Sequence, residues 1–422
     1  MQYVLRTGAC AVLLAIGAPV AALASEAIPG GSVDSLLALA KENNPEYAGM
    51  RYEADAAYER IAPAGALADP RLRVEPMDIT RGGTQNPTLL PSRVGSTWYT
   101  LMQDVPWFGK RELKRDIAAL DAEGAKGSAL GNWADLSSRI KSGYAQFYYL
   151  QLSARLTQEI LDLMARLEQV AQVRYAAGLA VQQDVIRAQV EQSSMRNELI
   201  ALENERRIVQ VRLNALLSRP ANAPLAPPEL LRPLPPAVRL EYAALEERVR
   251  ERNPQLFTAG AKLKAAEKTR ELTYKNRYPD FIFGVAPIQT GNAVQWGLMV
   301  ELNIPLQQTS RRAQEREAGA MLSAARARRD AAENQVLSEL GEYLSGLDAA
   351  RRTETLTTTS LLPQAELTFK SALASYENGK VDFATLLEAQ RQIRQTRQIQ
   401  IKARAEGQAR LADIERLLGE DL

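Results

Sequence analysis

The chain alternates short strand-like patterns with very long helix-like patterns. In four segments apolar and polar residues alternate with a period of two, which predicts half-buried strands; they are 71–75, 98–105, 280–286 and 295–304. After each strand pair, helix-compatible sequence begins near Lys110 and near Gln307. It continues for about 65 to 70 residues, a length on the order of 100 Å. No single globular domain accommodates helices of that length.

The helical patterns carry narrow apolar seams, which predict coiled-coil packing with water on at least one side. After a turn, each long helix is predicted to be followed by a return helix that ends at Leu217 or at Leu418. Pro363 is predicted to kink or interrupt the second long helix, because proline lacks a backbone donor.

The chain contains an internal repeat. Asn44-Pro45 recurs as Asn253-Pro254, and the segment 175–178 recurs as 376–379, in both cases about 200 residues later. The connection between the copies is rich in proline and is predicted to be an extended strap. The predicted organisation is a signal peptide (1–24), a first repeat (25–217), a linker (218–238) and a second repeat (239–422).

The first 24 residues are predicted to direct export. Arg6 precedes an apolar run that closes with Ala22-Leu23-Ala24, which is typical of a signal peptide. Cleavage after Ala24 would remove Cys10, the single cysteine. An exported chain without disulfides has to be held together by core packing or by oligomerisation.

Composition excludes several classes of function. The chain has no histidine, so a Ser-His-Asp or Cys-His pair and a histidine zinc site are excluded. Lys and Arg number 52 against 50 Asp and Glu, and a net charge of +2 gives no basis for binding nucleic acid. A metal enzyme built on carboxylates alone would need clustered acidic residues on short loops, and the sequence has no such cluster. We therefore expect a non-enzymatic protein without a cofactor or resident metal.

The strand patterns fit a transmembrane barrel with lipid outside and water inside. Taken strand by strand, a soluble hairpin over a hydrophobic core is favoured instead, and the long helices shift the balance. Four strands cannot close a barrel, which needs at least eight. Two chains would give eight strands and three would give twelve, and only the larger barrel leaves room for a pore. The predicted fold is mainly α with a small transmembrane β part, as a trimer with a 12-stranded barrel and an α-helical tunnel.

The two hairpin tips carry the most specific signal. Residues 174–179 are followed by Asp184-Val185, and residues 375–380 are followed by 386–389. With the strand pairs and the signal peptide, these tips resemble the TolC family of trimeric outer-membrane efflux channels over nearly the whole mature chain. Residues 103–111, QDVPWFGKR, are similar to the strand-to-helix junction of the heavy-metal efflux branch.

The resemblance implies a location and partners. It implies a homotrimer in the cell outer membrane, in contact with outer-membrane lipid, with its helical tunnel in the periplasm. It also implies a periplasmic adaptor protein and an inner-membrane pump, with the adaptor contacting the tips at Gly178, Leu179, Gly379 and Lys380.

The resemblance also suggests where the channel narrows. Some members use two aspartates one helical turn apart, and the matching positions here are Thr385 and Glu388. We add Asp184 and Asp382, which lie beside the turns, as further candidates for the constriction. An arginine that pairs the two hairpins in some members falls on Val381, so the details of closure are expected to differ.

Two other classes of protein remain open. A periplasmic adaptor also uses long helical hairpins, but it typically has one hairpin flanked by β-rich halves. A coiled-coil scaffold does not need a strand pair before each long helix. The cargo is also open, since metal ions, drugs or a secreted polypeptide all fit a passive duct.

Overall fold

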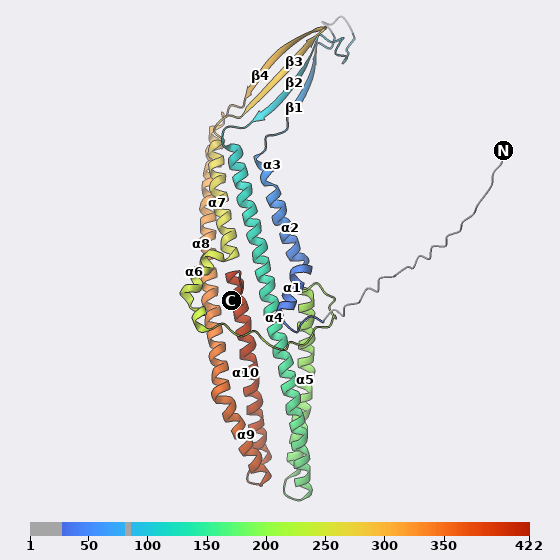
Figure 1. Ribbon diagram of the computed structural model, residues 1–422, viewed down its shortest axis with the longest axis vertical. Coiled ribbons are helices and arrows are strands. Elements are labelled where there is room, and N and C mark those ends of the chain that lie inside the picture. The colour runs from blue at the N-terminus through green and yellow to red at the C-terminus, as the bar shows by residue number, and fades with distance from the viewer. Residues whose placement is uncertain (1–27, 81–85) are drawn as a thin grey trace, which may run out of the picture.

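The computed structural model describes residues 28–80 and 86–422 of an elongated molecule with a small sheet at one end and helices along the rest (Figure 1). The predicted signal peptide lies outside the described residues, as does part of the first predicted strand connection. Within the described residues, no helix combines the length and hydropathy needed to cross a bilayer.

Two long helical hairpins form most of the molecule. The first consists of α4 (Lys110–Ala176), with 67 residues, and α5 (Gln182–Leu216). The second consists of α8 (Gln308–Leu356), α9 (Leu362–Glu377) and α10 (Phe383–Leu418). These bounds agree with the helix starts and ends predicted from the sequence to within one residue.

The second long helix is interrupted where proline predicts it. A π-helical turn, η2 (Thr357–Leu361), separates α8 from α9, and Pro363 follows in the first turn of α9. Because proline has no N–H to donate, the α-helical ladder cannot continue regularly through it.

Shorter helices precede each strand pair. They are α1 (Val33–Asn43), α2 (Pro45–Glu59) and α3 (Ile61–Gly65) in the first repeat, and η1 (Ala237–Leu240), α6 (Tyr242–Arg252) and α7 (Pro254–Lys275) in the second.

The repeated Asn-Pro pair has the same structural role in both copies. The side-chain oxygen of Asn44 accepts a hydrogen bond of 2.9 Å from the Tyr47 N–H and so caps α2. Its amide nitrogen donates to the Leu216 carbonyl, at the end of α5. Asn253 caps α7 in the same way and donates to the Leu417 carbonyl at 2.8 Å. Each asparagine therefore starts one helix and ties it to the end of the return helix of its own repeat.

The strands of the two repeats form one sheet. They are β1 (Arg71–Met77), β2 (Ser96–Val105), β3 (Phe281–Thr290) and β4 (Ala293–Leu302), in that order and all antiparallel. Within the sheet, the two repeats are joined by the β2–β3 pairing, which begins at Val105 and Phe281. This leaves β1 and β4 as the two edges.

One predicted loop is wrong. The predicted strands 280–286 and 295–304 leave 287–294 between them as a connection, but β3 continues through Pro287 to Thr290. The turn is reduced to Gly291 and Asn292, and Gly291 has a φ of 60°. Pro287 has no N–H for the ladder, and the β2–β3 pairing has no registered pair between Ile288 and Val285.

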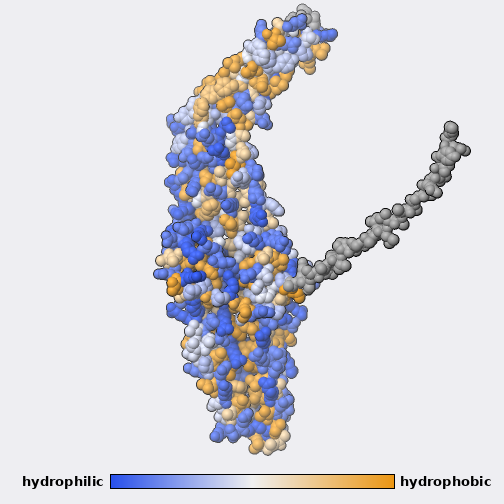
Figure 2. All heavy atoms as spheres, viewed as in Figure 1, coloured by the Kyte–Doolittle hydropathy of each residue, from blue (hydrophilic) through white to orange (hydrophobic). Residues whose placement is uncertain are grey.

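One face of the sheet is apolar and exposed. A row across all four strands consists of Leu72, Leu101, Val285 and Leu298, which lie opposite one another in register and are 65%, 55%, 47% and 79% exposed. Figure 2 shows hydrophobic atoms gathered over the sheet. A contiguous apolar surface of this kind marks a site of contact with lipid or protein.

The helices are arranged side by side in one layer (Figure 1). In the half next to the sheet, α4 packs against α2 and α7, and α7 packs against α8. In the other half, α4 packs against α5 and α10, and α10 packs against α8 and α9. The lateral edges of the layer are therefore α2 and α5 on one side and α8 and α9 on the other.

Candidate functional site at the hairpin tips

The first hairpin ends in a glycine turn. Gly178 has a φ of 71°, in the left-handed region that glycine adopts without strain. The Leu179 N–H donates to the Arg174 carbonyl at 2.8 Å, and the Gly178 N–H donates to the Tyr175 carbonyl at 3.0 Å. These two bonds satisfy carbonyls at the end of α4 and define a Schellman turn.

The second hairpin ends in the same turn. Gly379 has a φ of 70°, the Lys380 N–H donates to the Ser375 carbonyl at 2.8 Å, and the Gly379 N–H donates to the Tyr376 carbonyl at 3.0 Å. The sequence match between the tips is therefore a match of backbone geometry. The four residues predicted to contact an adaptor, Gly178, Leu179, Gly379 and Lys380, are all exposed.

Arg174 joins the two tips. Its Nη1 donates to the Glu377 carbonyl of the other hairpin at 2.7 Å, and its guanidinium lies 5.0 Å from the centre of the Tyr376 ring. Tyr376 is buried and packs edge-on against Phe383 at 5.6 Å. The arginine that pairs the hairpins in some family members falls on Val381 here, and in this chain Arg174 of α4 makes the contact between the tips instead. The sequence feature that could have indicated this contact is the position of Arg174, which precedes the turn glycine by four residues and so lies close to the tip.

Asp184 is buried between the two tips. Its side chain is in the first turn of α5, and the residue is only 8% exposed. Burial raises the pKa of Asp184, and nearby Asp382 acts in the same direction, whereas Arg187 and Arg174 oppose it. Nothing in the local pattern of polar and apolar residues indicates this burial, because it comes from packing against the second hairpin.

Asp382 and Thr385 form the N-terminal cap of α10. The Asp382 carboxylate accepts from the Thr385 backbone N–H at 2.9 Å and from its hydroxyl at 2.6 Å. These hydrogen bonds lower the pKa of Asp382. The two residues therefore have a clear structural role in starting the return helix.

Glu388 is exposed on α10, two helical turns beyond this cap. Arg391, one turn further, forms an ion pair of 2.6 Å with the buried Glu191 of α5. Arg394 pairs with Glu198 of α5 in the same way. The hairpins are thus joined by ionic contacts above the tips, while the Glu388 carboxylate is exposed beside them.

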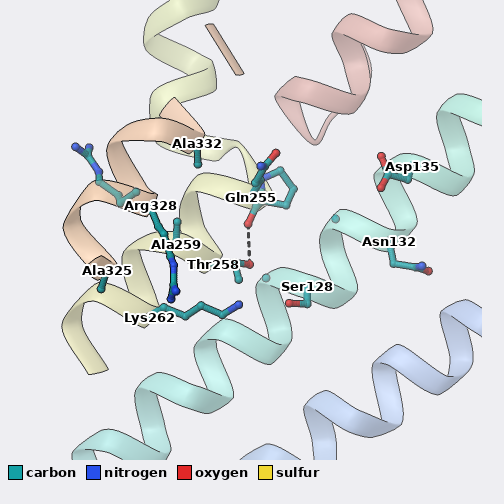
Figure 3. A pocket seen from close by; sticks show the side chains of 14 residues that line it. Ser128, Asn132, Asp135, Gln255, Thr258, Ala259, Lys262, Ala325, Arg328 and Ala332 are labelled. Carbon is teal, nitrogen blue, oxygen red and sulfur yellow. Dashed lines mark hydrogen bonds between the residues drawn. The ribbon is translucent and has the colours of Figure 1, made fainter. Parts of the chain in front are cut away.

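Several cavities lie along the helices, away from the tips. One of about 530 Å³ lies between α4, α7 and α8 (Figure 3). Gly127 and Gly131 of α4 form part of its wall, and Lys262 of α7 extends toward Ser128 of α4. Arg328 and Arg329 of α8 also line it. It contains none of the predicted site residues. Among residues 28–80 and 86–422, no three His, Cys, Asp or Glu side chains are grouped closely enough to hold a metal ion.

The fold therefore consists of two long helical hairpins below a four-stranded sheet that has one exposed apolar face. A sequence model of the outer membrane efflux protein family matches residues 36–219 and 245–420. The chain belongs to this family, which confirms the resemblance found in the tips. It is an efflux channel of the cell outer membrane with its helical tunnel in the periplasm, and the family is one of transport proteins and not of enzymes.

The chain is similar to individual proteins over nearly its whole length. The chain is 24% identical over 416 residues to the cobalt-zinc-cadmium resistance protein CzcC of Cupriavidus metallidurans, covering 92% of this chain and 90% of that protein. A membrane protein from Pseudomonas aeruginosa superposes with a TM-score of 0.78 at 20% identity, over 93% of this chain and 91% of that chain. The outer membrane protein VceC of Vibrio cholerae gives a TM-score of 0.77 at 15% identity, over 92% and 96%.

Proposed function

We propose that three copies of this chain form the outer-membrane exit duct of a tripartite efflux pump of the RND type that exports heavy-metal cations. The observation that carries the proposal is the open-edged sheet with one exposed apolar face. A single chain leaves the ladder groups of β1 and β4 unpaired, and an unpaired edge cannot face lipid.

Closure between copies satisfies these edges. Because each chain supplies an even number of antiparallel strands, β4 of one copy can pair with β1 of the next without breaking the alternation. Three copies would give twelve strands, enough for a barrel with an aqueous interior. The apolar row through Leu72 and Leu298 would then face lipid.

The helical layer has matching edges. Exposed apolar side chains lie on α2 and α5, among them Tyr52, Ile186 and Val190. The opposite edge, formed by α8 and α9, exposes Met321 and Leu367. The same closure that pairs β4 with β1 would bring these two edges together and cover both. The helices would then form the wall of a tunnel.

The tips are proposed to be the gate and the docking point. Threefold symmetry would bring three copies of Glu388 and of Asp184 toward one axis, with Asp382 and Thr385 beside them, and a ring of carboxylates attracts cations. The adaptor is proposed to contact Gly178, Leu179, Gly379 and Lys380. Val173, Leu179 and Val181, all exposed at the first tip, give such a partner an apolar surface.

The proposal that the cargo is heavy-metal cations is supported by the similarity to CzcC and by the motif at the strand-to-helix junction. CzcC is named for resistance to cobalt, zinc and cadmium, and residues 103–111 are similar to the heavy-metal branch. Deleting the gene is expected to lower tolerance of these cations and to leave drug tolerance and secretion of polypeptides unchanged. Loss of drug tolerance or of a secreted polypeptide, with normal metal tolerance, would replace the cargo assignment.

Assembly has its own test. Protein extracted by detergent from the outer-membrane fraction is expected to sediment as a trimer. A monomer found in the soluble periplasm would contradict the proposed function.

A further inference from the structure

We propose that the groove between α7 and α8, directly below the sheet, binds the phosphate headgroups of anionic phospholipids in the periplasmic leaflet of the outer membrane. This inference rests on the proposed function, which puts the apolar face of the sheet in lipid. It adds a lipid site on the helical part of the chain.

An aromatic band marks the boundary between sheet and helices. The Trp107 ring stacks on Tyr278, with centroids 5.0 Å apart, and on Phe281, with centroids 5.6 Å apart. Phe108 and Leu306, at the same junction, are strongly exposed. Aromatic rings with a polar edge are typical of the depth at which a membrane protein passes from hydrocarbon to headgroups.

The band lies on the same side of the molecule as the exposed apolar face. Phe281 and Phe283 stack on each other at 5.9 Å and alternate along β3 with the same parity as Val285, a member of the apolar row. Because Trp107 stacks on Phe281, the aromatic band continues this face toward the helices. In Figure 2 the hydrophobic surface of the sheet passes into a strongly hydrophilic surface over the helices immediately below it.

The groove below the band is strongly basic. Its volume is about 530 Å³, and its charged lining consists of Arg270 from α7, and Arg312, Glu315, Arg316 and Arg326 from α8. Glu315 is engaged by the Arg277 guanidinium, with Nη2 2.5 Å from Oε2, and Arg326 pairs with Glu267 at 3.4 Å. The single carboxylate in the lining is therefore bound by an arginine outside it, and the lining keeps a positive charge.

Tyr274 gives the groove a second kind of contact. Its ring lines the groove, with the guanidiniums of Arg270 and Arg277 each 5.3 Å from its centre. The ring and the buried Leu322 offer apolar surface beside the arginines. A phospholipid headgroup with its glycerol matches this mixture of cationic and apolar groups.

The distance of each arginine from the start of α8 decides whether it can reach a lipid headgroup. Arg312 and Arg316 lie four and eight residues into α8, or about 6 and 12 Å below its start by helical rise. A headgroup layer extends about 5 to 8 Å beyond the hydrocarbon on each side. Arginine presents paired donors that match phosphate oxygens. The exposed Arg312 thus lies within the headgroup layer, and the exposed Arg316, one helical turn further from the sheet, can reach the phosphates of the periplasmic leaflet by extending its long side chain upward.

The test measures lipid binding to the purified full-length trimer. Native mass spectrometry in mixed micelles would compare phosphatidylglycerol with zwitterionic phosphatidylethanolamine, for the unaltered protein and for the double variant Arg312→Gln/Arg316→Gln. A matched control, Lys262→Gln/Arg328→Gln, removes two charges from the same helices but at the cavity of Figure 3, where Arg328 is about 30 Å below the start of α8.

The expected result is a selective loss. Each basic residue near an anionic surface contributes about a fivefold factor in affinity, so the double variant should bind phosphatidylglycerol about 25-fold more weakly. Binding of phosphatidylethanolamine should not change, and the control variant should match the unaltered protein. Inorganic phosphate at millimolar concentration should not displace the bound lipid, because it cannot use the apolar part of the groove.

Several outcomes would overturn the inference. Equal phosphatidylglycerol binding by both double variants would mean that the groove is not the lipid site. Displacement by phosphate would point to a soluble anion as the ligand. A changed ion selectivity of the channel with unchanged lipid binding would mean that the groove faces the lumen. In each case trimers would still form, whereas failure of the unaltered chain to form trimers would refute the proposed function itself.

Discussion

Replacing Arg174 by glutamine is expected to loosen the contact between the two hairpin tips. The variant removes the guanidinium group, whose Nη1 donates to the Glu377 carbonyl at 2.7 Å and which lies 5.0 Å from the centre of the Tyr376 ring. A hydrogen bond from a charged group contributes about 1.5 to 3 kcal/mol, and a cation–π contact about 0.5 to 1 kcal/mol. The change should therefore destabilise the packed tip by about 2 to 4 kcal/mol in each protomer.

This loss converts into a measurable change in gating. Since about 1.4 kcal/mol is a factor of ten, the ratio of separated to packed tips should rise by about 30-fold or more per protomer. Single-channel recordings of purified protein in planar bilayers would report this as a longer open time. The control is Arg196→Gln, which removes an exposed arginine from α5. If the two variants gate alike, Arg174 does not hold the tips together, and the reasoning from its contacts is refuted.

Four further predictions concern the gate, the buried charges and the topology. Glu388→Gln should lower cation selectivity and weaken block by multivalent cations, with a smaller effect for Asp184→Asn, and unchanged selectivity in both would place the constriction at other tip residues. Burial raises the pKa of Asp184 in the packed tip, so the packed tip favours the protonated carboxyl. The packed tip therefore loses stability as pH rises from the usual aspartate pKa of about 3.9 through the raised pKa. Lowering the pH through that window should shorten open times, and Asp184→Asn should abolish this pH dependence. Lys141→Met removes one of the two cationic partners of the buried Glu415, 2.6 Å away, and leaves Arg232 at 2.9 Å. It should cost about 1.5 to 3 kcal/mol of stability, seen as a lower Tm, while Arg207→Met at an exposed pair should change Tm little. Epitope tags inserted at 88–92 and at 291–292 should be labelled on intact cells, and labelling only after permeabilisation would invert the topology.

The elements were largely predictable because their signals are local. Helix bounds follow from the run of helix-compatible residues, from the turn glycines Gly178 and Gly379, and from the Asn-Pro pairs that start α2 and α7. The break before Pro363 follows from its missing N–H. Strand positions were predicted within a few residues, apart from β3, where Pro287 was read as part of a loop.

The remaining features depend on contacts between distant segments. The pairing of β2 with β3 unites strands from different repeats, and alternation within one strand does not specify its neighbour. Arg174 and Asp184 acquire their roles only because the second hairpin packs against the first. The family pattern pointed to Val381 for the bridging arginine, and this chain instead supplies the charge from α4. Assembly into a trimer, the constriction and the adaptor contacts lie beyond a single chain and stay predictions.

The most direct test of the account is an engineered disulfide between β1 and β4. Within one chain these strands are separated by β2 and β3, or about 14 Å, whereas a disulfide needs Cα atoms about 4.4 to 6.8 Å apart. Any such bond must therefore join two copies. Arg73→Cys would be paired in turn with Gln295→Cys, Gly297→Cys, Met299→Cys and Glu301→Cys, which share its face of the sheet by registry, and with Leu298→Cys on the opposite face as the control.

The account predicts that at least one same-face pair gives cross-linked species of two and three chains, and no larger species, on a non-reducing gel of outer membranes. The Leu298→Cys pair should stay monomeric. Exclusively monomeric chains for every pair, or a ladder that continues beyond three, would contradict a closed trimeric barrel.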